Sequence, residues 1–106
     1  MGTARANEAA GLIDPADLDL LRRQGLANPL RQLRDSLVAH PELIPFKGVG
    51  GGTMGFYDTT RVVLLNGRWV YAAFDDGHIG GSGLFEFRVL RGGRVAWKRL
   101  AARLDE

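Results

Sequence analysis

The sequence predicts an α+β fold, in which an N-terminal helix pair, or one bent helix, packs on a four- to five-stranded antiparallel β-meander as a two-layer sandwich. Three observations support this fold class. The turn dipeptides Asn66-Gly67 and Gly92-Gly93 each separate two strand-forming runs. Two proline-containing helix start signals, Asp14-Pro15 and Asn28-Pro29, precede them in the chain. Twelve of the 15 glycines follow residue 47, so the two halves differ in character.

The helical half is defined by its caps and stops. Asp14 is expected to cap a short helix that runs to about Arg23 and ends at Gly25. A second helix follows Asn28 and stops before Pro41, because proline disfavours helical geometry in the preceding residue. The helices therefore occupy residues 15–40. The second helix carries one apolar stripe, which should face the sheet: Leu30, Leu33, Leu37 and Val38.

The domain organisation follows from where these patterns begin. Residues 1–13 are small and polar and show no strong period, so we expect a disordered N-terminal tail. Residues 14–106 are then a single α+β domain, with the sheet over 52–104.

The first hairpin is predicted from Asn66-Gly67, since Asn-Gly supplies the positive φ angles of a type I′ turn. A two-residue loop places Leu64 opposite Trp69. It also places Val62 opposite Tyr71, so all four side chains share one face.

The second hairpin, treated as a two-residue loop at Gly92-Gly93, places Arg88 opposite Trp97 for a cation–π contact. It also places Glu86 opposite Arg99 as an ion pair. The face assigned to the core then holds Phe85, Phe87, Val89, Ala96 and Leu100. A one-residue bulge would exchange these faces, because the side-chain period of a strand is two.

Composition excludes several function classes. The chain of 106 residues has no cysteine, which excludes disulfides and thiolate chemistry. It has no apolar run of membrane-spanning length and no hydrophobic signal region, so we expect a cytoplasmic protein with no membrane partner. We expect no cofactor and no metal site. The net charge is only +2, but residues 88–104 carry six cations and no acid, which makes the last hairpin locally basic.

Four polar residues are the candidates for general acid–base catalysis: Asp75, Asp76, His78 and Glu86. The first three lie within four positions, where Asp-Gly turn chemistry is the alternative explanation. The glycine-rich segment 48–55 is interpreted as the entry to the sheet, with a ligand loop as its alternative.

The binding candidates are aromatic and basic residues of the sheet: Trp69, Tyr71, Arg88, Trp97 and Arg99. They favour a non-enzymatic protein-interaction module, with a homo-oligomer or another protein as its partner. One alternative is a small-ligand-binding domain or minor enzyme with a pocket between helices and sheet. The other is a nucleic-acid or phosphate binder using the basic last hairpin, which is less favoured because the net charge is small.

Overall fold

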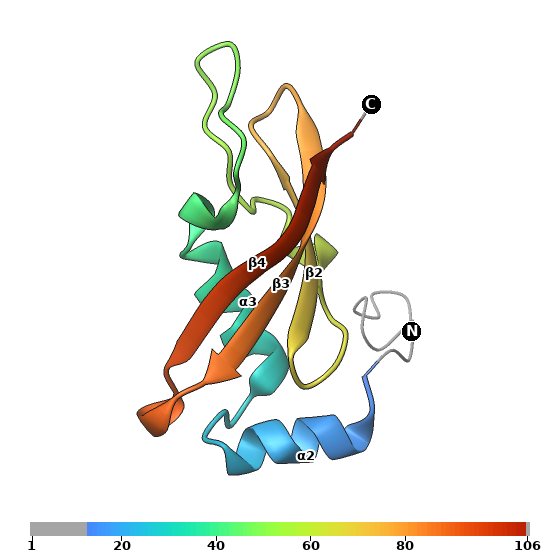
Figure 1. Ribbon diagram of the computed structural model, residues 1–106, viewed down its shortest axis with the longest axis vertical. Coiled ribbons are helices and arrows are strands. Elements are labelled where there is room, and N and C mark those ends of the chain that lie inside the picture. Colours follow the sequence, from blue (N-terminus) through green and yellow to red (C-terminus); the bar gives the residue numbers. More distant parts are fainter. Residues whose placement is uncertain (1–12, 106) are drawn as a thin grey trace.

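A computed structural model describes residues 13–105 of the chain, and it confirms the two-layer α+β architecture (Figure 1). The four strands form one antiparallel sheet in the order β1-β2-β3-β4. The elements are α2 (Pro15–Arg23), α3 (Pro29–Val38), β1 (Val62–Leu64), β2 (Trp69–Asp75), β3 (Gly80–Val89) and β4 (Val95–Leu104). Three short 3-10 turns complete the described chain: η1 (Pro41–Leu43), η2 (Thr59–Arg61) and η3 (Arg91–Gly93). Nearly all of the predicted tail, residues 1–12, lies outside the described residues.

The two helices are separate and begin at the predicted caps. The Asp14 carboxylate accepts from the Ala16 N–H, and the Asn28 side-chain oxygen accepts from the Arg31 N–H. Helix α2 ends in a Schellman motif, in which Gly25 adopts φ 118° and the Leu26 N–H donates to the Leu21 carbonyl at 3.0 Å. Leu21 and Leu26 are both fully buried, so this cap also fixes where the chain enters the core.

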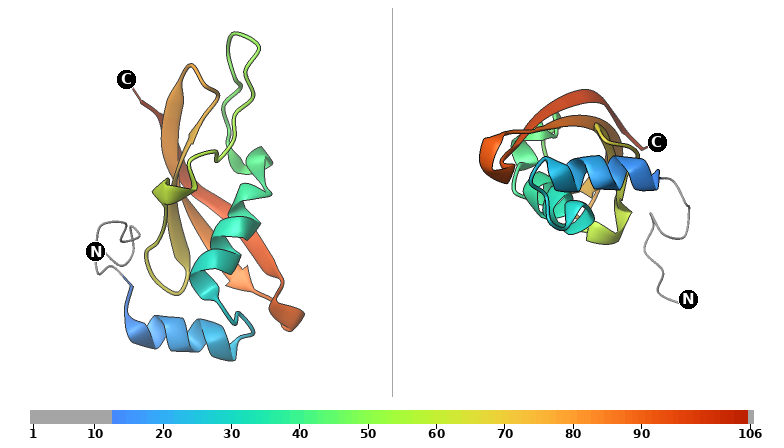
Figure 2. Two further views of the ribbon diagram at one scale, coloured as in Figure 1. Left: turned by 180° about the vertical axis from the view of Figure 1, so that it is seen from behind. Right: turned by 90° about the horizontal axis from the view of Figure 1, so that it is seen from below.

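Helix α3 covers one face of the sheet, while α2 lies across the end of the sheet that holds the β1–β2 turn (Figure 2). The apolar stripe of α3 points inward as predicted, with Leu33 and Leu37 buried. Between the layers, Phe56 makes edge-to-face ring contacts with Phe74 and Phe85, at centroid distances of 6.3 Å and 5.5 Å. These contacts form the centre of the hydrophobic core.

The predicted register of the first hairpin is wrong by one residue. The pairs are Leu64 with Val70 and Val63 with Tyr71, and the Leu65 N–H donates to the Trp69 carbonyl at 2.9 Å. The loop therefore has three residues, and Gly67 does not adopt the positive φ angle that a type I′ turn requires. The Asn66 side chain closes the loop by accepting from the N–H groups of Arg68 and Trp69.

The second hairpin is shifted in the same way. The Leu90 N–H donates to the Arg94 carbonyl, which gives a three-residue loop, and Phe87 pairs with Trp97. The predicted cation–π and ion pairs of this hairpin are therefore wrong, because Glu86 lies opposite Lys98 and Arg88 opposite Ala96. Ala96 consequently leaves the core face. Further along, β4 has a bulge, because Phe85 pairs with Arg99 whereas Leu84 pairs with Ala101. Leu100, the extra residue at this bulge, is 39% exposed instead of buried.

The backbone of the segment before β1 pairs with the sheet at one point. Gly55 forms an isolated bridge with Asp75 through two backbone hydrogen bonds of 3.0 Å and 3.1 Å. The described chain therefore has four strands and one bridge, instead of a fifth strand. Over residues 13–105, no helix combines the length and the apolar character needed to cross a bilayer.

Candidate functional site

The side of the sheet that faces away from α3 is here called the outer face, and in Figure 1 no helix formed by residues 13–105 lies on it. Strand alternation and the observed register place one row of side chains across its middle, formed by Tyr71, Leu84 and Ala101. Trp69, Glu86 and Lys98 form the next row toward the β1–β2 turn. Ala73, Ser82 and Arg103 form the row on the other side.

Large apolar side chains on and beside the outer face remain open to solvent. Trp69 and Tyr71 are 39% and 38% exposed, and neither packs against the core. A shallow groove of about 250 Å³ lies beside Tyr71, where small residues leave the sheet hollow. Its lining is Tyr71, Ser82, Gly83, Leu84, Ala101, Ala102 and Arg103. Because Trp and Tyr combine apolar area with a polar atom, such surfaces are typical of contact sites.

The charges on this face are mainly positive. Glu86 is the acid of the central rows, and its Oε2 lies 3.5 Å from the Arg68 guanidinium and accepts from Trp69 Nε1 at 3.3 Å. Lys98 lies directly across the ladder from Glu86. Since Glu86 already interacts with these neighbours, it neutralises little of the positive charge that the other cations of β3 and β4 give to the outer face.

The five predicted binding residues are divided between the two faces. Trp69, Tyr71 and Arg88 lie on the outer face. Trp97 instead packs on Phe87 at a centroid distance of 5.7 Å and donates from Nε1 to Ser36 Oγ at 2.9 Å. Arg99 donates to the Leu43 carbonyl, also on the helical side. Leu84 and Ala101 complete the groove, and their pairing across the ladder depends on the bulge in β4.

Asp76 anchors two loops at the far end of the sheet. Its carboxylate accepts from the N–H groups of Val49 at 2.6 Å, His78 at 2.7 Å and Ile79 at 2.8 Å. The bond from the Ile79 N–H, followed by those from Val49 and His78, lowers the pKa of Asp76 to about 2. The side chain therefore stays ionised and joins the glycine-rich segment to the 76–79 turn, which agrees with turn chemistry.

The four candidates for acid–base chemistry do not converge. The exposed His78 ring lies against Gly50, and Asp75 accepts from the Gly77 N–H. Glu86 lies six residue pairs away along the β2–β3 ladder, which corresponds to about 20 Å. General acid–base partners need to lie within hydrogen-bond reach of one substrate, so these residues do not form one catalytic group. Over the described residues, no cluster of three metal-ligating side chains occurs.

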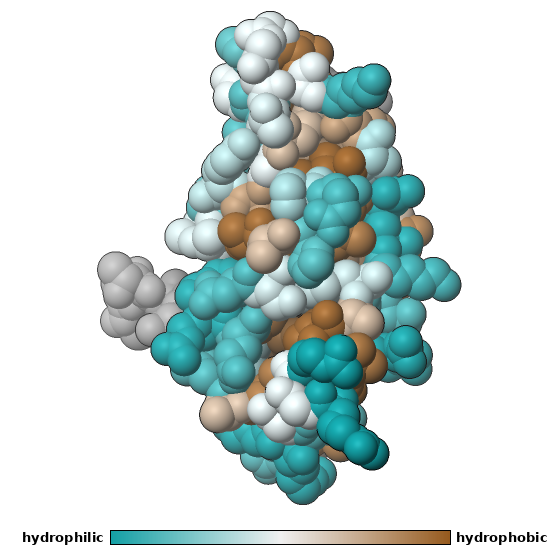
Figure 3. All heavy atoms as spheres, turned by 90° about the vertical axis from the view of Figure 1, so that its left-hand side faces the viewer, coloured by the Kyte–Doolittle hydropathy of each residue, from teal (hydrophilic) through white to brown (hydrophobic). Residues whose placement is uncertain are grey.

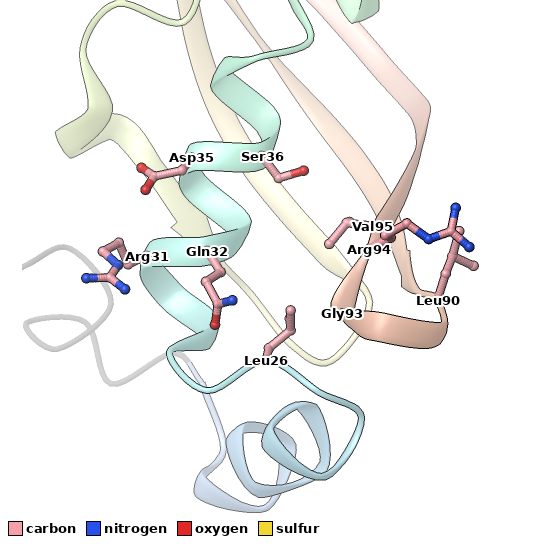
Figure 4. Close-up of a pocket in the computed structure, with 9 residues that line it drawn as sticks. All are labelled: Leu26, Arg31, Gln32, Asp35, Ser36, Leu90, Gly93, Arg94 and Val95. Atoms are coloured by element: carbon pink, nitrogen blue, oxygen red, sulfur yellow. The ribbon is translucent and has the colours of Figure 1, made fainter.

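A second concave region lies between α3 and the β3–β4 turn, with a volume of about 820 Å³ (Figure 4). Leu26, Ser36 and Val95 point into it, whereas Arg31 and Asp35 point away. One end of this cleft is closed where the β3–β4 turn meets the α2–α3 connection, because the backbones of Gly93 and Gly25 are in contact there. Figure 3 looks onto the left-hand side of Figure 1, where hydrophobic patches alternate with hydrophilic side chains.

Comparisons with protein-family models, with curated proteins and with solved structures find no match to this chain. A functional assignment therefore rests on the outer face, the cleft and the loops.

Proposed function

We propose that this chain is a non-enzymatic protein-interaction module that binds its partner through the outer face of the sheet. The observation that carries the proposal is the exposure of Trp69 and Tyr71 beside an apolar groove, on a face that no described helix covers. Leu100, at the bulge next to Ala101, adds a third large apolar side chain that is 39% exposed. Clustered apolar side chains in contact with solvent mark association sites on small domains.

The charge distribution supports an acidic partner. Residues 88–104 contribute six cations and no acid, and Arg88, Lys98 and Arg103 lie on the outer face. A second copy of the chain would bring the same cations against this face, which is unfavourable. A partner with an apolar centre and an acidic rim matches both the groove and the charges.

Small-ligand binding in the cleft beside α3 is the second candidate. Its volume of about 820 Å³ and its apolar side chains Leu26 and Val95 favour it. The polar side chains of the cleft are already engaged or point elsewhere, however. Gln32 points into it, but its Oε1 accepts from the Asn28 N–H at 2.7 Å. The Ser36 hydroxyl accepts from Trp97, while Arg31 and Asp35 point away. It therefore ranks below the outer face.

Selection from a displayed library of random short peptides tests the proposal. At low salt we expect enrichment of peptides that combine acidic and large apolar residues. Their binding should weaken about tenfold or more in Tyr71→Ser, as for a central aromatic contact. Tyr57→Ser is the matched control, because Tyr57 is 62% exposed and lies outside the four strands.

Two results would overturn the proposal. One is a selection without enrichment, or with peptides that bind Tyr71→Ser as tightly as the wild type. The other concerns the choice of partner: a stable wild-type dimer in light scattering that Tyr71→Ser disrupts would show that the face binds a second copy instead.

A further inference from the structure

Strand β4 leaves one edge of the sheet open. It extends over ten residues, about 33 Å, and among residues 13–105 it pairs only with β3 (Figure 1). Successive residues of β4 direct their backbone N–H and C=O groups alternately toward β3 and toward the open edge. Two hydrogen bonds to β3 show which residues do which, because the Leu90 N–H donates to the Arg94 carbonyl and the Asp105 N–H donates to the Gly80 carbonyl. The residues between them whose backbone groups point to the open edge are Val95, Trp97, Arg99, Ala102 and Leu104.

The side chains of this edge disfavour pairing with an identical strand. Charged residues and bulges commonly protect edge strands from association, and β4 has both. Two copies paired antiparallel would bring Lys98, Arg99 and Arg103 close to the same residues of the other chain. The charges that exclude a second copy would favour a strand that carries carboxylates.

The apolar groove lies directly beside this edge. Along the outer face of β4, the bulge places Lys98, Ala101 and Arg103 in succession. Ala101 is small, so a side chain on a neighbouring strand would lean across it toward Tyr71 and Leu84. A strand beside β4 would thus meet a cation, then a hollow, then a second cation on the outer face.

We propose that the partner supplies an extended acidic segment that adds to the open edge of β4, with glutamate or aspartate at two alternate positions flanking one large apolar residue. This proposal rests on the proposed function and names its binding mode. Backbone hydrogen bonds supply affinity in strand addition, and pockets for alternate side chains supply specificity. A nucleic acid has no N–H and C=O ladder to pair with the edge, and the Trp97 ring is turned toward α3, away from the outer face.

Fluorescence anisotropy with synthetic peptides tests the binding mode. The probe is a labelled peptide of about the length of β4, in which glutamate alternates with valine and one central glutamate is replaced by leucine. The comparison peptide has the same sequence with an N-methyl group on each valine, which removes the N–H donors that face β4. We expect the parent peptide to bind and the N-methylated peptide to bind at least tenfold more weakly.

Charge reversal on the protein supplies the second comparison. Lys98→Glu combined with Arg103→Glu should abolish binding of the acidic peptide and permit binding of its lysine counterpart. Arg23→Glu combined with Arg61→Glu is the matched control, with the same net charge and both exposed side chains on α2 and η2 instead of on the sheet. Thermal unfolding of both double variants establishes that each is folded.

The outcomes separate this inference from the proposed function. If the N-methylated peptide binds as tightly as its parent while Tyr71→Ser weakens both, strand addition is overturned and the outer face remains the binding site. If Tyr71→Ser changes no peptide's affinity, the proposed function fails. If a single-stranded oligonucleotide binds more tightly than the peptide and displaces it, the ligand is a nucleic acid and the inference is overturned.

Discussion

Alanine substitutions at the two glycines of the β3–β4 turn measure the contact that joins the helical layer to the sheet. Gly92 and Gly93 have nearly equal φ angles of 79° and 78°. A left-handed conformation costs an L-residue about 1–2 kcal/mol, so the backbone terms of Gly92→Ala and Gly93→Ala nearly cancel when compared. Their surroundings differ, because a Cβ on Gly92 meets nothing within 4 Å, whereas one on Gly93 comes within 3.1 Å of the Gly25 carbonyl oxygen.

The difference in stability between the two variants therefore reports the contact between Gly93 and Gly25. Overpacking costs typically 1–3 kcal/mol, and Gly25 lies in an exposed turn that can shift, so we expect about 1 kcal/mol more destabilisation for Gly93→Ala. With a urea m-value of about 1–3 kcal/mol/M, the midpoint of Gly93→Ala should lie about 0.3–1 M below that of Gly92→Ala.

Equilibrium urea unfolding followed by tryptophan fluorescence measures both midpoints. Gly92→Asn serves as the control for the backbone term, because asparagine tolerates the left-handed region and should be milder than alanine. Equal midpoints for the two alanine variants, or a lower midpoint for Gly92→Ala, would refute the view that the two turns touch.

Three further predictions concern the core, the helix–sheet contact and the loop anchor. Phe85→Ala removes a ring with 0% exposure and should cost about 3–5 kcal/mol, lowering the thermal midpoint by at least roughly 10 °C; a change below about 1 kcal/mol would contradict its central place. Ser36→Ala deprives Trp97 Nε1 of its acceptor and should cost about 1 kcal/mol, measured by urea unfolding; in a Trp97→Phe background the cost should vanish. The pKa of Asp76, about 2, lies below its unfolded value of about 3.9, so its stabilising effect is complete above about pH 4 and is lost as the pH falls through about 2. Acid unfolding of Asp76→Asn should accordingly show a weaker pH dependence in that window, and an unchanged acid limb would contradict the role of Asp76.

The helices illustrate what can be predicted from local sequence. Asp14, Asn28 and Gly25 act within a few residues of themselves, through side-chain bonds to nearby N–H groups and through a positive φ. The helix boundaries were therefore predictable to within two residues at each end. The inward stripe of α3 was predictable for a related reason, since helical periodicity alone places Leu33 and Leu37 on one side.

The hairpins show where local reasoning stopped being sufficient. Both turns lie where Asn66-Gly67 and Gly92-Gly93 predicted them, but each loop has three residues instead of two. Such a change moves one strand by one residue, which turns its side chains to the other face. Trp97 thereby became a partner of α3 instead of an outer-face residue, and Val62 and Leu64 turned away from the face that holds Trp69 and Tyr71.

The sequence by itself determined the order of elements, the helix caps, the turn positions and the basic character of the last hairpin, because these depend on neighbouring residues or on composition. Tertiary structure decided the register, the bulge at Leu100 and hence which residues form the outer face and its groove. The physical reason is that several registers allow the same backbone hydrogen bonds to form between the strands. The choice among them is made by burying Val70, Phe85 and Phe87 against helices that lie far away in the chain.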